Sequence, residues 1–257
     1  MHTRQKKLLE TLQRTGFLGF SEAAELTGVT PMTIRRDVRS LEERHLVMAV
    51  KGGMIPHPAG YEPENSPLLL NPAKFALAEA LYNAIMPAKS LFLSSGFTVL
   101  AFAKILARRN ILPMTVITNS LPVASALFRS SCKVILLGGE LRATSLDLIG
   151  PVTERNLEEY HVDWLVSGCD GAFPDYGFYT SDERLSDLEK KSLRIADRAA
   201  IITDSTKFGR RALTRFASLK DIQLLVTDDE LPAADCEKIR AAGVEILFAK
   251  ADPVRDG

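Results

Sequence analysis

The chain has 257 residues, which is enough for one large or two modest domains, and its 46% hydrophobic and 25% charged residues are typical of a globular protein. Its 32 Lys and Arg residues balance 32 Asp and Glu residues, so the zero net charge excludes a general attraction to nucleic acid or membranes. No apolar run approaches the roughly 20 residues that cross a bilayer, and the N-terminus leads into a helix rather than a signal peptide. We therefore expect a cytoplasmic protein without a membrane partner.

The first 57 residues predict three helices and carry nine basic and six acidic residues, a net charge of +3. Leu8, Leu9 and Leu12 form an apolar stripe within residues 4–15, and a short helix from Ser21 ends at Gly28. Thr30 is a helix cap, Pro31 suits the first turn, and apolar residues then recur at i, i+4 and i+7 up to Leu41. Two helices joined by the tight turn at residues 27–29 predict a helix-turn-helix.

The exposed side of the helix over residues 31–42 carries the residues that we expect to contact DNA. Such a helix places its first turns in the major groove, where Thr and Arg reach base edges and phosphates. Residues 46–50 and 51–54 read as two short strands around a glycine turn, which would form a wing. A solvated cationic face is the alternative, but the order of cap, turn and wing favours DNA binding. The expected DNA contacts are Thr30, Met32, Thr33, Arg35, Arg36, Arg39 and Lys51.

Five prolines between residues 55 and 72 predict an extended connector, because proline interrupts regular helix. We expect a winged helix-turn-helix domain at residues 1–57, a linker at 58–72 and a larger domain at 73–257. In the larger domain, almost continuously apolar runs alternate with helical patterns, which predicts an α/β fold with a mostly parallel sheet. The expected strands are residues 90–94, 114–118, 133–137, 164–168, 199–203, 223–227 and 244–248, and the expected helices are 73–85, 99–108, 121–129, 184–198 and 233–242.

Small and polar residues follow five of these strands, where ligands bind in open α/β sheets. Glycine and hydroxyl residues at a helix start present backbone N–H groups to a phosphate or carboxylate, Lys207 adds a positive charge, and Asn119 or Asp170 suits sugar hydroxyls. Turn and capping roles are the alternative for each residue taken singly. The expected ligand-binding residues are Ser94, Ser95, Gly96, Phe97, Thr98, Asn119, Ser120, Gly138, Gly139, Asp170, Gly171 and Lys207.

Residues 26–53 resemble the winged helix of the DeoR family of bacterial transcription regulators. The family helix reads V-S-x-x-T-I-R-R-D-L-x-x-L-E, and residues 29–42 read V-T-P-M-T-I-R-R-D-V-R-S-L-E. The family wing reads R-x-H-G-G-A, whereas residues 48–54 keep the glycines and lack the arginine and histidine.

The resemblance extends to the larger domain. The family's D-x-G-x-T, T-N-S, L-G-G, D-G and D-S-x-K-F-G motifs are similar to residues 94–98, 118–120, 137–139, 170–171 and 204–209, with Ser94 in place of the aspartate. The resemblance implies an effector domain that is similar to ribose-5-phosphate isomerase and the CoA transferases, and it implies binding of a phosphorylated sugar or related metabolite.

The likeness to an isomerase raises an enzymatic alternative, a sugar-phosphate isomerase with an attached DNA-binding domain. Isomerisation needs a placed carboxylate base and a group that polarises the carbonyl. The isomerase pattern D-G-A-D-E becomes Asp170-Gly171-Ala172-Phe173-Pro174 here, which loses the second acid. Glu189-Lys190 resembles a downstream glutamate-lysine pair of the enzymes, but an exposed helix pair is at least as good an interpretation. The three cysteines, Cys132, Cys169 and Cys236, and the four histidines are scattered, so we expect no metal, no cofactor and no enzyme activity.

We therefore predict a repressor of carbohydrate-metabolism genes that binds a double-stranded DNA operator and is released by a phosphorylated sugar. It should be a homodimer or homotetramer, so that recognition helices engage repeated half-sites. A constitutive DNA-binding scaffold that senses nothing is a third possibility.

Overall fold

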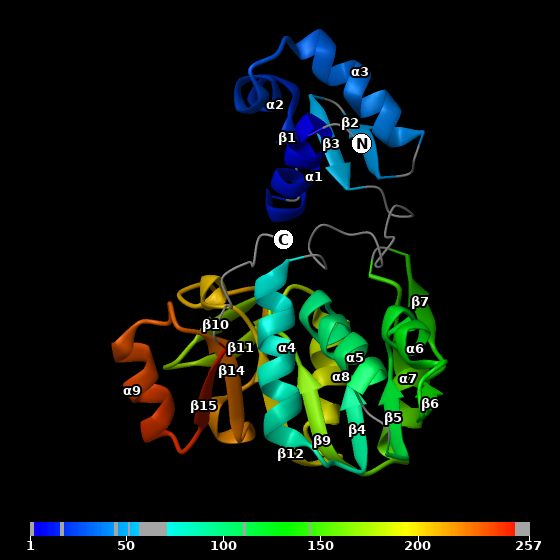
Figure 1. Cartoon of the computed structure of the whole chain (residues 1–257), viewed down its shortest axis with the longest axis vertical. Coiled ribbons are helices and arrows are strands. Elements are labelled where there is room, and N and C mark those ends of the chain that lie inside the picture. Colours follow the sequence, from blue (N-terminus) through cyan, green and yellow to red (C-terminus); the bar gives the residue numbers. More distant parts are fainter. Residues whose placement is uncertain are drawn as a thin grey trace. The chain divides into compact units, whose positions relative to one another are not determined.

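The computed structural model describes residues 3–15, 18–43, 46–50, 52–56, 71–109, 112–143 and 145–249. The chain divides into two compact units, one within residues 1–70 and one built from residues 71–142 and 146–257 (Figure 1). We call them the N-terminal unit and the sensor unit and describe each by itself. Within the described residues, no helix is long and apolar enough to cross a membrane.

The N-terminal unit consists of three helices and a small antiparallel sheet. The helices are α1 (Thr3–Thr15), α2 (Phe20–Thr27) and α3 (Pro31–Glu42), and the strands β1 (Leu18–Gly19), β2 (Val47–Val50) and β3 (Gly53–Pro56) lie in the order β1-β3-β2. Helix α2 ends at Gly28, whose φ of 69° places it in the left-handed region that closes helices. The apolar stripes predicted from the sequence pack into one core, which includes Leu8, Leu12, Ile34, Val38, Leu41 and Met54.

The sensor unit is built on a seven-stranded sheet in which every strand pair is parallel (Figure 1). The order is β15-β14-β12-β9-β4-β5-β6. The bounds are β4 (Ser90–Leu93), β5 (Met114–Thr118), β6 (Cys132–Leu136), β9 (Val162–Ser167), β12 (Ala196–Ile202), β14 (Leu224–Asp228) and β15 (Glu245–Ala249). All seven strands expected from the apolar runs are present, and the predicted α/β class with a parallel sheet is confirmed.

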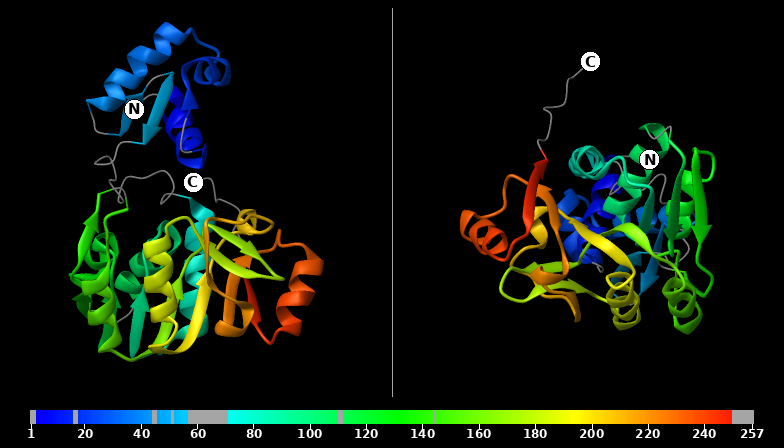
Figure 2. Two further views of the ribbon diagram at one scale, coloured as in Figure 1. Left: turned by 180° about the vertical axis from the view of Figure 1, so that it is seen from behind. Right: turned by 90° about the horizontal axis from the view of Figure 1, so that it is seen from below.

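Helices cover both faces of this sheet, as buried parallel strands require. They are α4 (Pro72–Ile85), α5 (Phe97–Arg109), α6 (Leu121–Leu127), α7 (Pro151–Glu158), α8 (Glu183–Ser192) and α9 (Ala233–Ala241), with short 3-10 turns η1 (Ser205–Lys207) and η2 (Leu219–Asp221). Helices α4 and α5 lie on one face and α8 on the other (Figures 1 and 2). Most residues of the central strands are accordingly buried, with Phe92, Leu165 and Ile201 fully enclosed.

Two small antiparallel sheets complete the sensor unit, and the apolar pattern did not predict them. Strands β7 (Glu140–Arg142) and β8 (Asp147–Ile149) form a hairpin, and β10 (Gly171–Phe173), β11 (Gly177–Thr180) and β13 (Thr214–Ala217) form a second sheet. The predicted helix over residues 184–198 is wrong at its end, because α8 stops at Ser192 and β12 starts at Ala196. Pairing of Ala196 with Val162 on β9 overrides the helix propensity of this segment, which is rich in Leu, Lys and Arg.

Candidate functional site

Helix α3 begins with a cap that the sequence encodes directly. The Thr30 side chain accepts a hydrogen bond from the Thr33 backbone N–H at 3.3 Å, which satisfies one of the donors left free at a helix start. Pro31 occupies the first turn, where its missing N–H is not needed. The helix therefore starts at a fixed point, and the residues after the cap have a defined register.

One face of α3 is buried and the other carries three arginines. Ile34, Val38 and Leu41 are at most 1% exposed and fix the helix to the core of the unit. Met32 is 76% exposed, and Arg35, Arg36 and Arg39 are also exposed. These four residues follow the i, i+3, i+4, i+7 spacing of a single helix face, so the structure brings most of the expected DNA contacts together.

Contacts with the two neighbouring helices fix the position of α3 and of one of its exposed arginines. Asp37 lies on the buried side of α3 and accepts hydrogen bonds from Arg4 Nε at 2.5 Å and Arg4 Nη2 at 3.0 Å. This two-point bond raises the pKa of Arg4 and ties α1 to α3. The Arg35 guanidinium stacks 4.4 Å from the centroid of the Phe20 ring on α2, which restricts the cation.

The predicted wing is a two-stranded hairpin. Val47 pairs with Pro56 and Val50 pairs with Gly53, and Gly52 takes a φ of 89° in the turn. The Ala49 N–H donates to Glu42 Oε1 at 2.6 Å, which connects the hairpin to the end of α3. Lys51, the expected phosphate contact of the wing, lies outside the described residues.

In the sensor unit, the order of the strands locates the place where a ligand site is expected. From β4 the chain proceeds to β5 and β6 in one direction, and it later returns beside β4 with β9 and continues through β12, β14 and β15 in the other. Open α/β sheets bind ligands outside the carboxyl ends of the strands at such a switch point. The loops that follow β4 and β9 flank this point. The expected residues Ser94 to Thr98 follow β4, and Asp170 and Gly171 follow β9.

The β4 loop is hydrogen-bonded to two buried carboxylates. The Ser94 hydroxyl donates to Glu189 Oε1 on α8, and the Ser95 hydroxyl donates to Asp147 Oδ2 on β8 at 2.8 Å. Burial raises the pKa of Glu189 to about 7, and the Ser94 hydrogen bond opposes this only in part. Glu189 is 4% exposed, so the alternative that it belongs to an exposed helix pair is wrong.

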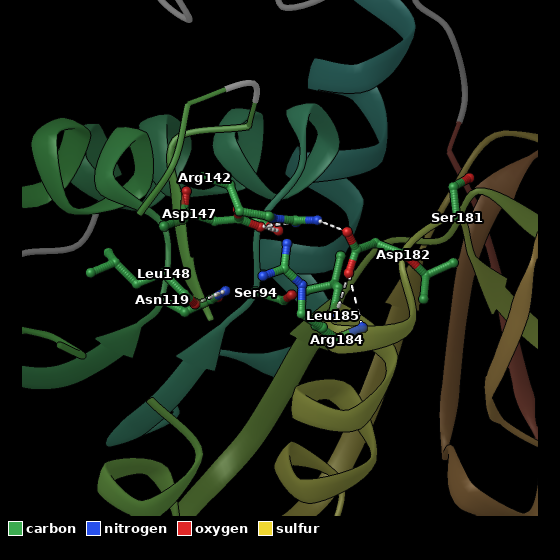
Figure 3. A network of polar contacts seen from close by, with 12 residues as sticks. Ser94, Asn119, Arg142, Asp147, Leu148, Ser181, Asp182, Arg184 and Leu185 are labelled. Carbon is green, nitrogen blue, oxygen red and sulfur yellow. Dashed lines mark hydrogen bonds and ion pairs between the residues drawn. The ribbon is translucent and has the colours of Figure 1, made fainter. Parts of the chain in front are cut away.

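An arginine links one of these carboxylates, Asp147, to the start of α8. Arg142 on β7 donates to Asp147 from Nε at 2.7 Å and from Nη2 at 2.5 Å, and its Nη1 lies 2.8 Å from Asp182 Oδ2 (Figure 3). Burial would lower the pKa of Arg142, but the two carboxylates outweigh it and raise the pKa. Asp182 also caps α8 through the N–H groups of Arg184 and Leu185. The network joins three elements around the β4 loop.

The loop after β5 is buried against the same hairpin. Asn119 is fully buried, its Nδ2 donates to the Leu148 carbonyl at 3.1 Å, and its Oδ1 has no partner among the described residues (Figure 3). Ser120 caps α6 by accepting from the Val123 N–H at 3.4 Å. An unsatisfied buried acceptor is rare and is suited to a donor such as a ligand hydroxyl or a water molecule.

The glycines after β6 have a packing role. The Gly138 carbonyl accepts from Thr153 Oγ1 at 2.8 Å. Gly139 has a φ of 152°, and a Cβ there would overlap Thr153 Oγ1 and approach the Ile149 carbonyl oxygen at 2.8 Å. The close packing of Thr153 and Ile149 against the start of the β7–β8 hairpin therefore requires a glycine at position 139.

Two lysines lie near the end of β12. Lys74 on α4 is half-buried, and its Nζ contacts Thr98 Oγ1 at 3.3 Å and Asp204 Oδ2 at 3.5 Å. Burial lowers the pKa of Lys74, as does the positive charge of Lys207, while Asp204 opposes both. Lys207 lies in η1 and is half-buried, and its positive charge acts on Asp204 and on Lys74.

Not all of the expected ligand residues point to a ligand. Asp170 is exposed, and its Oδ2 accepts from the Ser181 N–H at 2.7 Å, while Gly171 packs against the backbone of Arg210. Sequence reasoning did not propose Lys74, Arg142, Asp147 or Asp182 as part of the site. Arg142 and Asp147 face each other only through the unpredicted β7–β8 hairpin.

Comparisons with known proteins match both units. Residues 4–56 match the DeoR-like helix-turn-helix domain, and residues 71–229 match the DeoR C terminal sensor domain. The chain is thus a helix-turn-helix protein with a sensor domain, the class that its fold and exposed arginines define. It belongs to the DeoR family of transcription regulators.

Individual relatives match over nearly the whole chain. A putative aga operon transcriptional repressor of Escherichia coli O157:H7 is 28% identical over 95% of this chain and 93% of its own length. The HTH-type regulator YulB of Bacillus subtilis strain 168 is 30% identical over 95% of each chain. Among solved structures, ribose 5-phosphate isomerase of Methanocaldococcus jannaschii is similar over 53% of each chain with 16% identity and a TM-score of 0.40, a likeness too low to support a conclusion about this protein.

Proposed function

We propose that this DeoR-family protein is a transcriptional repressor of carbohydrate-metabolism genes that releases its operator when the sensor unit binds a phosphorylated sugar. The observation that carries the proposal is the exposed arginine face of α3, presented at the start of a chain that continues into a sensor domain. The relative named as an aga operon repressor supports the direction of the effect.

The proposal assigns DNA contact to the exposed side of α3 and to the wing. Arg36 and Arg39 supply charge for phosphates, and each neutralised phosphate adds salt-dependent affinity. The proposed DNA-binding residues remain Thr30, Met32, Thr33, Arg35, Arg36, Arg39 and Lys51. The proposed division remains a DNA-binding domain at residues 1–57, a linker at 58–72 and a sensor domain at 73–257. At least a dimer is required for two helices to engage half-sites one helical turn apart.

The proposed effector site lies at the carboxyl ends of β4, β5 and β12. Lys74 and Lys207 give this edge a cationic side that suits a phosphate, and the backbone N–H groups at the start of α5 add to it. Asn119 Oδ1 supplies a buried acceptor for a donor such as a hydroxyl. Of the residues expected from the sequence, we leave out Gly138, Gly139, Asp170 and Gly171, because they have packing or turn roles. The residues proposed to contact the effector are Ser94, Ser95, Gly96, Phe97, Thr98, Asn119, Ser120 and Lys207, with Lys74 added.

We infer that the sensor unit does not catalyse isomerisation. A proton transfer between adjacent carbons needs a free carboxylate base at the substrate. Asp147 is paired with Arg142, and Asp170 is exposed and bonded to a backbone N–H. Glu189 is 4% exposed and bonded to the Ser94 hydroxyl, so this carboxyl is enclosed by the protein. Incubation of the purified protein with sugar phosphates tests this directly, and measurable turnover would favour the enzymatic alternative.

The experiment that tests the proposed function compares two variants of the full chain on the same DNA. Arg36→Ala should weaken operator binding with or without effector, since the contact is to DNA. Lys207→Ala should bind the operator like the wild-type protein and lose the response to effector. Unchanged affinity of Arg36→Ala and Arg39→Ala would contradict the proposed docking of α3.

A further inference from the structure

The cationic face of α3 carries one apolar side chain, at its N-terminal end. Met32 is 76% exposed, the highest value among the large hydrophobic side chains that the structure describes. It shares a helix face with Arg35, Arg36 and Arg39, and lies opposite the buried Ile34 and its neighbours. Single exposed hydrophobic residues are common, so the position of Met32 rather than its exposure is informative.

The polar groups of the first turn of α3 are occupied with one another. The hydroxyl oxygens of Thr30 and Thr33 lie 3.0 Å apart, and Thr30 Oγ1 also accepts from the Thr33 N–H. Pro31 has no N–H to donate. The apolar group that this turn offers to a base edge is the flexible thioether side chain of Met32.

We propose that Met32 reads the 5-methyl group of a thymine in each operator half-site. The residues at the start of a recognition helix contact base edges in the major groove, and the thymine methyl is the apolar group displayed there. Arg36 and Arg39, one and two turns further along the same face, anchor the helix on phosphates. The inference rests on the proposed DNA-binding function and names the base feature that it recognises.

The first experiment selects bound duplexes from a random DNA library with the full-length wild-type protein and with Met32→Gln. Glutamine has a helix propensity close to that of methionine, so α3 is retained. The wild-type protein should enrich a half-site with an invariant thymine, and Met32→Gln should lose the preference at that one position only. Identical enriched sequences for the two proteins would overturn the proposal.

The second experiment removes the methyl group from the DNA. Replacing the selected thymine by uracil should weaken wild-type binding about fourfold, which is the change in affinity expected when one buried methyl-sized group is removed. Met32→Leu should respond like the wild-type protein, whereas Met32→Gln should bind both duplexes equally. An equal effect of uracil on the wild-type protein and Met32→Gln would overturn the proposal.

Two controls separate this inference from the proposed function. Leu213 is 74% exposed in the sensor unit, and Leu213→Gln removes a similar apolar surface without altering α3, so it should leave the thymine preference intact. If the wild-type protein enriches no sequence, the DNA-binding function itself fails and the inference fails with it. If the wild-type protein enriches a sequence but its affinity does not depend on the thymine methyl group, the proposed role of Met32 is overturned and the DNA-binding function stands.

Discussion

The buried Glu189 allows a sharp test of the sensor unit through the pH dependence of its stability. This carboxyl is 4% exposed, accepts a hydrogen bond from Ser94, and leaves Oε2 without a partner among the described residues. Its pKa of about 7 lies above the ordinary value of 4.5, because burial disfavours the charged form. We therefore expect Glu189→Gln, which has no ionisable group, to alter how stability changes with pH.

The sign follows from proton linkage. A carboxyl with a raised pKa in the folded protein holds its proton more tightly than in the unfolded chain, so its contribution is fully present below pH 4.5 and is lost as the pH rises through 7. Each pH unit in this window lowers the free energy of unfolding by about 1.36 kcal/mol, so the total loss between pH 4.5 and 7 is up to about 3 kcal/mol. Glu189→Gln should not show this loss.

The measurement is urea unfolding of the full chain at pH 5 and pH 8, followed by tryptophan fluorescence. Trp164 is the single tryptophan and lies buried in β9, so its signal reports the sensor unit. Glu237→Gln, an exposed carboxyl on α9, is the matched control and should follow the wild-type protein. Parallel pH profiles for the wild-type protein and Glu189→Gln would refute the reasoning.

Two further substitutions test the packing around the proposed site by urea unfolding. Gly139→Ala should destabilise the sensor unit by about 1 to 3 kcal/mol, because the added Cβ overlaps Thr153. Gly243→Ala is the control and should cost less, because a Cβ at that position meets no atom within 4 Å. Equal losses for the two variants would contradict the packing role of Gly139. Asp147→Asn should cost about 3 kcal/mol, since it removes the buried charge that pairs with Arg142 and leaves the guanidinium only its partly exposed partner Asp182 among the described residues. A loss below 1 kcal/mol would show that this ion pair is not maintained in solution.

The parts of the fold that follow from local pattern were predictable from the sequence. Continuous apolar runs marked all seven strands of the parallel sheet, and the cap at Thr30 with the stripe through Ile34, Val38 and Leu41 defined α3. The short strands β7, β8, β10, β11 and β13 were not predicted, because they are three or four residues of partly polar sequence whose pairing depends on tertiary contacts.

The sequence predicted only those residues of the candidate site that come at or directly after the ends of the sheet's strands. Ser94, Asn119 and Lys207 follow predicted strands, so their common edge could be inferred. The partners of the residues after β4 come from elsewhere in the sequence. Glu189 on α8 bonds to Ser94, Asp147 on an unpredicted hairpin bonds to Ser95, and Lys74 on α4 bonds to Thr98. Ion pairs between distant segments leave no periodic signal in a single sequence.

The most direct test of the account is the coupling between the two units. Operator affinity of the wild-type full chain should be measured by fluorescence anisotropy at fixed salt, with a panel of sugar phosphates and the matching unphosphorylated sugars. We predict that a sugar phosphate weakens binding by about 5-fold to 150-fold, the usual range of allosteric coupling, and that the unphosphorylated sugar does not. Operator affinity that no phosphorylated sugar alters, even one that raises the melting temperature of the protein, would contradict the account.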